Sequence, residues 1–536
     1  MNEKNDVSGI NKKHLPIICV ILLAEIAILA FATWKWGIGH LDSDDSAEMI
    51  LAELLSRTGG IMTKNWYYST ELRVLNTQIV MSALFRFFSD WKIIRALGTA
   101  ILLLILSGSY LYFCSSVRLG RKLIYLSPLI VWPFSALYYD FVLFGLYYIP
   151  HISIIFLSLG LVLDWRQRWA RVRLVALFAL SFVAGLGGIR MLVICYIPML
   201  FSVAVSYIPF LKTKNGTDSR SIVRAFTAAV GCIIGYGINT KVLSGIYSFF
   251  YQYQISFVFP SKSQMKNLIS SVLAFFEVVR QKGTFVDSLT HLLGLLVFAV
   301  VVLMIIRLLL NWRSLPQEIQ ILLLFFILCF SVAVVTVLFT TQYWAKRYMI
   351  MPCIGFVVVL AAYFDKFPFS RPLYKAVYGF IIAAELLIGF NQYCSFATTN
   401  KHSKMDSAMQ AIIESGMEFG FGDWDASDIL TEITNGRIHM CKLLSYKEPI
   451  PWYWLMEKDF PKYAQNGPIF LLMDNSMLSY HSDKGPVVGD WEEKDLKYLE
   501  QGTVFFKDDH YTVWTYDSFE YFEAVTGQSF LENRTK

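Results

Sequence analysis

The sequence predicts a polytopic α-helical membrane protein that ends in a small soluble domain. Its mean hydropathy is +0.48, and 55% of its residues are hydrophobic while only 16% are charged, whereas a soluble domain is about 25% charged. Charge also divides along the chain: residues 395–536 hold 13 Lys and Arg against 23 Asp and Glu, and residues 1–394 hold 34 against 18. These patterns predict a membrane domain over 1–394 and a soluble domain over 395–536.

Apolar runs predict about eleven transmembrane helices. A span needs about 20 apolar residues, and the first run carries Glu25 and lacks a small-residue cleavage site, so it is expected to be an anchor rather than a signal peptide. The runs cover 15–36, 93–114, 123–139, 141–163, 174–189, 191–210, 225–243, 292–310, 321–340, 349–364 and 376–394.

Basic residues predict the orientation, because Lys and Arg gather in alternate loops and such loops face the cytoplasm. An odd number of spans then places the N-terminus in the cytoplasm and the C-terminal domain outside the plasma membrane. The outer loops are 37–92, 244–291 and 341–348. The basic excess faces anionic lipid, so no nucleic-acid partner is expected. The basic residues of the inner loops are Lys12, Lys13, Arg118, Arg121, Lys122, Arg166, Arg168, Arg171, Arg173, Lys212, Lys214, Arg220, Arg224, Arg313, Lys366, Arg371 and Lys375.

The tail is expected to fold as a small α/β or α+β domain. Short apolar runs at 468–473, 503–506 and 511–516 alternate with Gly and Asp turns, and a helix is predicted from Ser407 to Gly416. The whole chain is therefore expected to be a helical membrane body that carries an extracytoplasmic domain.

Four carboxylates follow the first span, at Asp42, Asp44, Asp45 and Glu48. A helical run follows them, so Asp44 or Asp45 would lie at a helix N-terminus with Glu48 about one turn on. Such a cluster can raise the pKa of one member for acid-base catalysis, or hold Mg²⁺ or Mn²⁺ through Asp44 and Asp45. The alternative is a helix cap in which Asp45 and Glu48 form a variant of the capping box, although a cap accounts for one aspartate and not for three.

Four further side chains lie at the predicted outer ends of spans, where ionisable groups are costly and point to function. They are His151, Arg190, Lys346 and Arg347. Guanidinium groups match phosphate oxygens, so these residues are candidates for binding the phosphate of a donor. The alternatives are snorkelling at the interface for Lys346 and Arg347, and a hydrogen-bonded packing role for His151.

Other charged residues near these positions have simpler expectations. Asp140 is expected to pair with one of the cations, and Glu71 and Arg73 are expected on the surface of a helix, although the neighbouring aromatics at 66–68 would suit a sugar or a lipid headgroup. The predicted cytoplasmic face shows only Lys and Arg flanks. We therefore expect one extracytoplasmic site in which carboxylates face cations, as needed to bind a phosphate and activate a hydroxyl acceptor.

Several motifs are absent from the sequence. It contains no GxxxxGK[ST], GxSxG or HExxH pattern, which argues against a P-loop ATPase, a hydrolase with that nucleophile elbow and a zinc protease. Nothing suggests binding of a cytoplasmic nucleotide sugar.

Taken together, the arrangement resembles the GT-C superfamily of membrane glycosyltransferases. The resemblance rests on the acidic first outer loop, the multispan body, the run 347–352 (RYMIMP) that opens a late span, and an outer C-terminal domain. The chain also resembles an uncharacterised bacterial group whose tails contain a segment similar to 420–428 followed by 435–437. It implies transfer of a sugar from a polyprenyl-phosphate donor to a cell-envelope glycan, lipid or protein. Carried onto this chain, it makes Asp44 the first choice for the catalytic carboxylate and Asp42 the second, with Asp45 and Glu48 supporting them.

The alternative from another class is a lipid-linked saccharide flippase or another transporter. A transporter would place ionisable residues near the bilayer midplane in broken helices, often within inverted repeats. Here the ionisable residues cluster toward one face and no repeat is detected, which favours the transferase.

Overall fold

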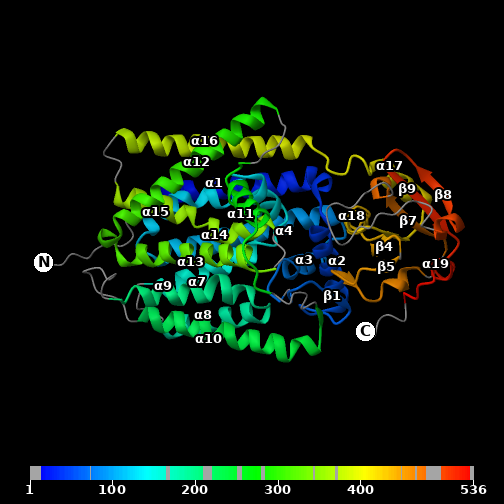
Figure 1. Ribbon diagram of the computed structural model, residues 1–536, viewed down its shortest axis with the longest axis horizontal. Coiled ribbons are helices and arrows are strands. Elements are labelled where there is room, and N and C mark those ends of the chain that lie inside the picture. The colour runs from blue at the N-terminus through cyan, green and yellow to red at the C-terminus, as the bar shows by residue number, and fades with distance from the viewer. Residues whose placement is uncertain are drawn as a thin grey trace.

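The computed structural model describes residues 14–72, 74–164, 170–208, 220–249, 256–278, 284–341, 345–367, 372–447, 449–464, 467–477 and 497–530. Figure 1 shows an elongated bundle of helices joined at one end to a smaller domain that contains strands. The last helix of the bundle, α16, ends at Thr398, and the first helix of the smaller domain, α17, begins at Asp406.

Seven helices in the described part of the chain are long and apolar enough to cross a membrane. Each coincides with one of the predicted runs, so these runs form helices as expected. The seven segments are His14–His40 (α1 and η1), Trp91–Ser116 (α4), Arg220–Gly245 (α10 and η5), Phe285–Leu310 (α12), Gln317–Phe339 (α13), Lys346–Lys366 (η7, α14 and α15) and Pro372–Thr398 (α16).

The stretch between α4 and α10 is built from shorter pieces. Ala136–Phe144 and Ile149–Leu163 form a pair bent by 86°, so the described residues hold seven spans, or eight if this pair counts as one. The predicted count of eleven therefore stays a prediction. The pieces are α5 (Gly120–Leu123), η2 (Ile124–Ile130), α6 (Ala136–Tyr138), η3 (Tyr139–Phe144), α7 (Ile149–Leu163), α8 (Ala170–Leu186), η4 (Leu192–Tyr196) and α9 (Ile197–Val205).

Small residues let helices approach closely within the bundle. Helix α10 carries Gly231 and Gly235 one turn apart, and a Cβ atom added at Gly235 would lie 2.1 Å from the carbonyl oxygen of Phe182 in α8. Gly185 of α8 approaches the backbone of Cys232 in α10 in the same way. Close backbone packing of this kind holds membrane helices together where lipid and side chains are equally apolar.

A small sheet joins three segments that the sequence places outside the membrane. Strand β1 (Trp66–Tyr68) pairs in parallel with β2 (Ser248–Phe249) and in the antiparallel sense with β6 (Met456–Glu457). The first two strands belong to the loops 37–92 and 244–291, and the third belongs to the C-terminal domain. These outer segments therefore lie together at one end of the bundle, beside α2 (Ser43–Thr58) and α3 (Gln78–Leu84), while α11 (Lys262–Phe275) packs among the bundle elements η7 and α13.

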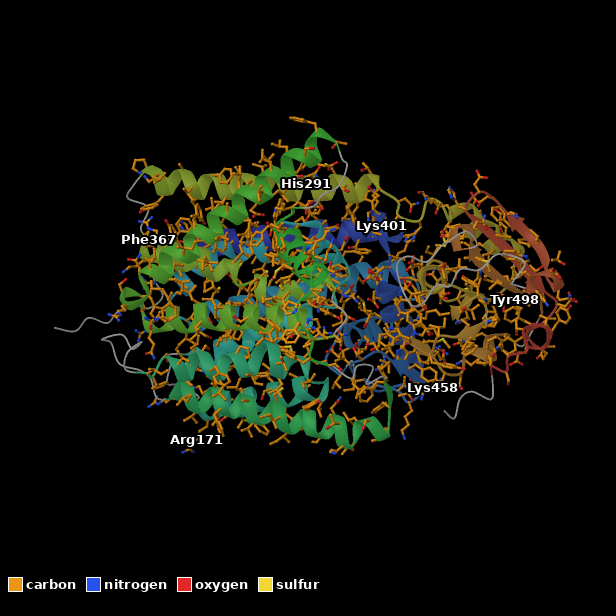
Figure 2. The ribbon with its side chains drawn as sticks, viewed as in Figure 1. Arg171, His291, Phe367, Lys401, Lys458 and Tyr498 are labelled. Atoms are coloured by element: carbon orange, nitrogen blue, oxygen red, sulfur yellow. The ribbon has the colours of Figure 1, made fainter. Side chains whose placement is uncertain are left out.

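The opposite end of the bundle carries part of the predicted inner face. Figure 2 places Arg171 and Phe367 at the end away from Lys401, Lys458 and Tyr498. This separation is the one that the basic loops predict. Several of the predicted basic residues lie outside the described residues, namely Lys12, Lys13, Arg166, Arg168, Lys212, Lys214 and Arg371.

The C-terminal domain contains a six-stranded mixed sheet in the order β5-β4-β3-β7-β9-β8. The central strands β4, β3 and β7 are parallel, and the outer pairings are antiparallel. Helix α18 (Trp424–Ile433) connects β3 to β4 and packs against α2 of the membrane domain. The other elements are α17 (Asp406–Ser415), β3 (Phe419–Gly422), β4 (His439–Ser445), β5 (Ile450–Pro451), β7 (Ile469–Asp474), β8 (Thr503–Lys507), β9 (Tyr511–Tyr516) and α19 (Phe519–Thr526).

Candidate active site

The acidic segment after the first span begins helix α2, and Asp42 is its N-cap. The Asp42 side chain accepts a hydrogen bond of 2.7 Å from the backbone N–H of Asp45, which satisfies one of the free donors of the first turn. The expected cap is therefore present, but the variant capping box of Asp45 and Glu48 is wrong, because Asp45 stands three residues inside the helix. One carboxylate of the cluster has a structural role, and the others require a separate explanation.

Asp44 lies next to the cap and forms an ion pair with Arg347. The Arg347 Nη1 to Asp44 Oδ2 distance is 2.8 Å, and both side chains keep partial exposure, at 29% and 22%. The same guanidinium lies over the rings of Phe141 and Tyr147. The structure thus brings together a carboxylate from the first outer loop and a cation from a span that begins about 300 residues later.

Asp45 is buried, at 2% exposure. Its Oδ1 atom has no hydrogen-bond partner among the described residues, and Gly145 approaches so closely that an added Cβ would lie 2.7 Å from it. Burial, reinforced by the neighbouring Asp42, holds the pKa of Asp45 well above its ordinary range, because a desolvated carboxylate resists ionisation. Burial and then the charge of Asp44 raise the pKa of Asp42 to about 6.

Glu48 faces the outer loop rather than the other carboxylates. Its Oε2 atom accepts a 2.8 Å hydrogen bond from the Thr77 hydroxyl, and Asn76 lies at 3.5 Å. Glu48 is buried at 6% exposure. These contacts give it a role in holding the segment before α3 against α2.

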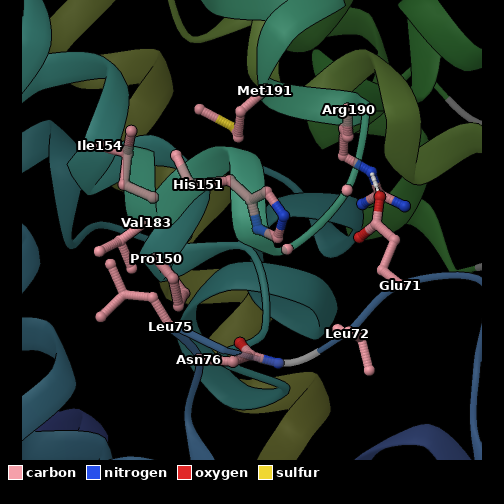
Figure 3. A pocket seen from close by; sticks show the side chains of 13 residues that line it. Glu71, Leu72, Leu75, Asn76, Pro150, His151, Ile154, Val183, Arg190 and Met191 are labelled. Carbon is pink, nitrogen blue, oxygen red and sulfur yellow. Dashed lines mark ion pairs between the residues drawn. The ribbon is translucent and has the colours of Figure 1, made fainter. Parts of the chain in front are cut away.

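Arg190 and His151 line a small pocket beside the acidic segment (Figure 3). The pocket has a volume of about 40 Å³. Arg190 forms an ion pair with Glu71, with 2.8 Å between Nε and Oε1, and its guanidinium lies over the ring of Tyr348. His151 Nδ1 lies 3.2 Å from the carbonyl oxygen of Tyr147, one turn earlier in the chain.

Tyr148 lies close to both arginines, Arg190 and Arg347. Its hydroxyl is buried without a hydrogen-bond partner among the described residues, and the charges of Arg190 and Arg347 both act on it. Tyr348 also lies between the two cations, since it follows Arg347 in sequence and packs under Arg190. Lys346 is exposed and makes no hydrogen bond or ion pair with the described residues. Three of the four predicted cationic positions therefore converge, while Lys346 stays on the surface.

Glu71 has a different environment from the one expected. It lies in a bend before α3 rather than on a surface helix, and it neutralises Arg190. Arg73 lies outside the described residues. Asp140 pairs with a cation as expected, but with Lys401 at 3.4 Å, a residue of the C-terminal segment that was not among the candidates.

Arg95 is an important residue that the sequence reasoning did not identify. It is buried in α4, forms a bidentate ion pair with Glu432 of α18 at 2.6 and 2.7 Å, and donates a 3.0 Å hydrogen bond to the carbonyl oxygen of Asp45. An arginine inside an apolar run was the available signal. Its partner could not be identified, because Glu432 lies 337 residues away.

The carboxylates do not form a metal site made of protein ligands alone. Asp44 is committed to Arg347, and the described residues contain no group of three or more His, Cys, Asp or Glu that could hold an ion. Hard divalent cations usually take six or more oxygen ligands. Because Mg²⁺ is usually bound by one or two carboxylates together with water and phosphate oxygens, the metal role of Asp44 and Asp45 stays a prediction.

Comparisons with known proteins bear on the fold. No protein-family model and no curated protein matches the sequence. Among solved structures, ArnT from Cupriavidus metallidurans in the apo state matches with a TM-score of 0.54 and 11% identity, over 93% of this chain and 97% of that chain. The structure of ArnT bound to undecaprenyl phosphate matches with a TM-score of 0.53 and 12% identity over the same shares.

A third structure is the oligosaccharyltransferase of Archaeoglobus fulgidus in complex with zinc and sulfate, with a TM-score of 0.47 and 13% identity, over 89% of this chain and 70% of that chain. Over nearly its whole length, this chain shares the fold of ArnT.

Proposed function

We propose that this protein is a membrane glycosyltransferase that moves a sugar from a polyprenyl-phosphate donor to a hydroxyl group of an extracytoplasmic acceptor. The observation that carries the proposal is the meeting of Asp44 with Arg347, and of Glu71 with Arg190, at the outer end of the bundle. A carboxylate that can take a proton lies beside cations that can hold a phosphate. ArnT, which shares the fold, has been solved bound to undecaprenyl phosphate.

In the proposed step, the carboxylate of Asp44 and the two arginines have separate roles. The Asp44 carboxylate takes the proton of the acceptor hydroxyl, and the acceptor oxygen forms a bond to the anomeric carbon of the donor. The bond from that carbon to the phosphate oxygen breaks, and its electron pair leaves with the polyprenyl phosphate. Arg347 and Arg190 stabilise the charge that develops on the phosphate. His151 lines the same pocket and contributes a polar wall.

Asp42 and Asp45 support Asp44 in this proposal. Asp42 fixes the start of α2, and burial raises the pKa of Asp45 well above its ordinary range, which disfavours a further negative charge in the cluster. Asp44 is the better base because it is partly exposed, whereas Asp45 cannot reach an acceptor without movement of the backbone.

The donor is tested by binding. Purified full-length protein in nanodiscs should retain undecaprenyl phosphate in native mass spectrometry. The double variant Arg190→Gln/Arg347→Gln should lower that affinity at least tenfold, and Arg57→Gln, which removes an exposed arginine at the end of α2, should leave it unchanged. Equal affinity in the folded double variant would assign both arginines to the membrane interface instead.

The base is tested by turnover with membrane-extracted polyprenyl-phosphate sugars. Removing a general base costs about 10²- to 10⁴-fold, so Asp44→Asn should lose most transfer. Asp42→Asn should lose less, because asparagine caps about as well as aspartate. Wild-type transfer by Asp44→Asn, Asp42→Asn and Asp45→Asn alike would reject the mechanism.

The orientation is proposed from the basic loops and from the gathering of the outer loops at one end. A reporter fused after the last residue should be active only outside the plasma membrane, with the N-terminus in the cytoplasm. Reporter activity in the cytoplasm would reverse the membrane side assigned to the site.

One observation favours the flippase as a second candidate. Glu25 in α1 and Glu385 in α16 are buried within membrane spans, and the Oε2 atom of each has no hydrogen-bond partner among the described residues. Intramembrane carboxyl groups often line transport pathways. Translocation of a fluorescent lipid-linked saccharide in proteoliposomes, lost in Glu25→Gln, would favour transport over transfer.

A further inference from the structure

Five half-buried aromatic residues lie where the C-terminal domain meets the membrane domain, and we call them the aromatic ledge. They come from three parts of the chain: β1, the first residue of α18, and the loop between β5 and β6. None is part of the mechanism described above. The ledge consists of Tyr67, Trp424, Trp452, Tyr453 and Trp454.

The rings of the ledge are packed side by side. The centroids of Trp424 and Trp452 are 4.9 Å apart, and those of Trp452 and Trp454 are 6.4 Å apart in a stacked arrangement. The ring of Tyr453 lies 5.0 Å from that of Tyr67. The ring contacts thus form two groups: the three tryptophans pack together, and the Tyr67–Tyr453 pair joins the outer loop to the C-terminal domain.

A buried lysine holds the ledge in place. Lys442 is fully buried, and its ammonium group contacts Asp428 at 2.5 Å and the carbonyl oxygen of Leu455 at 2.8 Å. It also lies 4.4 Å from the centroid of the Trp424 ring. Leu455, which follows Trp454, has a φ of +47°, a conformation that non-glycine residues adopt rarely. These contacts attach the aromatic loop and the Trp424 ring to strand β4.

The ledge adjoins the proposed base. The Ser43 hydroxyl, next to Asp44 in sequence, donates a hydrogen bond to the carbonyl oxygen of Trp424, and helices α2 and α18 pack together. The charge of Asp44 acts on both Lys442 and Asp428. A molecule on the ledge can therefore present a group to the acidic end of α2.

The chemistry of the ledge favours a carbohydrate. All five residues are Tyr or Trp, which combine a π face with a polar N–H or O–H group. The apolar C–H face of a sugar ring packs on such π faces, while its hydroxyls need polar partners. The indole N–H groups of Trp424 and Trp452 are not buried and make no hydrogen bond to a described residue, so both are available to sugar hydroxyls.

A charged side chain extends this surface. Lys458 lies at the junction of the two domains (Figure 2), with its ammonium group 5.0 Å from the centroid of the Tyr67 ring. The Lys458 ammonium group already donates a 2.7 Å hydrogen bond to the Ser248 hydroxyl. An apolar protein partner or a lipid tail would leave the two indole N–H groups without partners, whereas the hydroxyls of a saccharide can accept from both.

We propose that the aromatic ledge binds a saccharide, and that this saccharide is the acceptor whose hydroxyl group is glycosylated. The second half of the proposal rests on the proposed function. The first half, binding of a carbohydrate at the ledge, stands on the ledge residues alone.

The test uses the full-length protein in nanodiscs, fluorescently labelled, on a printed array of oligosaccharides, with binding of undecaprenyl phosphate measured in parallel. The wild type should bind a subset of the saccharides. Trp452→Ala and Tyr67→Ala, which each remove a ring from a different contact group of the ledge, should each lower that binding at least tenfold and leave undecaprenyl phosphate binding unchanged. Tyr521→Ala, which removes an exposed aromatic ring on α19, is the matched control and should bind saccharides as the wild type does.

Two results would overturn the ledge proposal. One is a wild-type protein that binds no saccharide on the array, and the other is binding that survives both ledge variants or is lost equally in Tyr521→Ala. Binding of saccharides without binding of undecaprenyl phosphate would instead reject the proposed donor and leave the ledge as a carbohydrate site. The two proposals therefore fail in distinguishable ways.

Discussion

The ion pair between Arg95 and Glu432 predicts a strong energetic link between the two domains. Its side chains are 6% and 5% exposed, and the guanidinium binds both carboxylate oxygens. The same guanidinium donates to the carbonyl oxygen of Asp45. Replacing Arg95 by Met would leave the Glu432 carboxylate buried without a cation and remove a donor from the acidic end of α2.

The expected magnitude follows from the burial of both partners. Breaking a buried pair by removing one partner costs about 3–5 kcal/mol, whereas replacing both partners by apolar residues is often neutral. Arg95→Met should therefore lower the free energy of unfolding by about 3–5 kcal/mol, and Glu432→Leu should lower it by a similar amount. The double variant Arg95→Met/Glu432→Leu should recover most of the loss.

Denaturant unfolding of the detergent-solubilised protein, followed with a thiol-reactive dye, measures this effect. Six of the eight cysteines are buried, and Cys441 lies in the C-terminal domain that the pair attaches. Lys401→Met, which breaks the exposed pair with Asp140, should cost less than about 1 kcal/mol and serves as the control. A loss below 1 kcal/mol for Arg95→Met would refute the idea that the buried pair joins the domains.

Two further predictions concern the acidic segment. Gly145→Ala places a Cβ within 2.7 Å of Asp45 Oδ1 and within 2.6 Å of a backbone carbonyl oxygen. This variant should therefore destabilise the protein by about 1–3 kcal/mol and lower the rate of sugar transfer. The control Gly237→Ala, which has open space at its Cβ, should change neither stability nor transfer. Because the pKa of Asp42 is raised to about 6, its ionisation should lower the free energy of unfolding as the pH rises from about 4 through 6. Asp42→Asn should flatten this dependence of unfolding free energy on pH. An unchanged slope would show that Asp42 is not the group responsible.

The spans were predictable from the sequence because their signal is local. A run such as 292–310 is apolar over its whole length, and it forms part of α12. The stretch 123–210 was harder, because Pro128 and the sharp turn before α7 divide the apolar residues into short pieces. Hydropathy averages over a window and does not register a bend of 86°.

The candidate site was predictable in its residue types and less so in its pairings. Asp44 and Arg347 stood out because charges beside apolar runs are rare, but no local rule paired Arg190 with Glu71 rather than with another carboxylate. The cap was assigned to the wrong aspartate, since the acidic run offered several positions for the first turn of α2. Such pairings depend on how helices pack, which a single sequence does not reveal.

The two ion pairs of the site place a further constraint on the proposed reaction. Asp44 is bound to Arg347, and Glu71 to Arg190, so neither the base nor the anion-binding groups are free as the site stands. A phosphate that enters between the arginines competes with both carboxylates for the same guanidinium groups. Each N–H that it takes from Asp44 releases the carboxylate from its ion pair, so that the carboxylate can accept a hydrogen bond from an acceptor hydroxyl instead. Binding of the donor would therefore prepare the base, and the variant Arg347→Gln should affect donor affinity and proton transfer together.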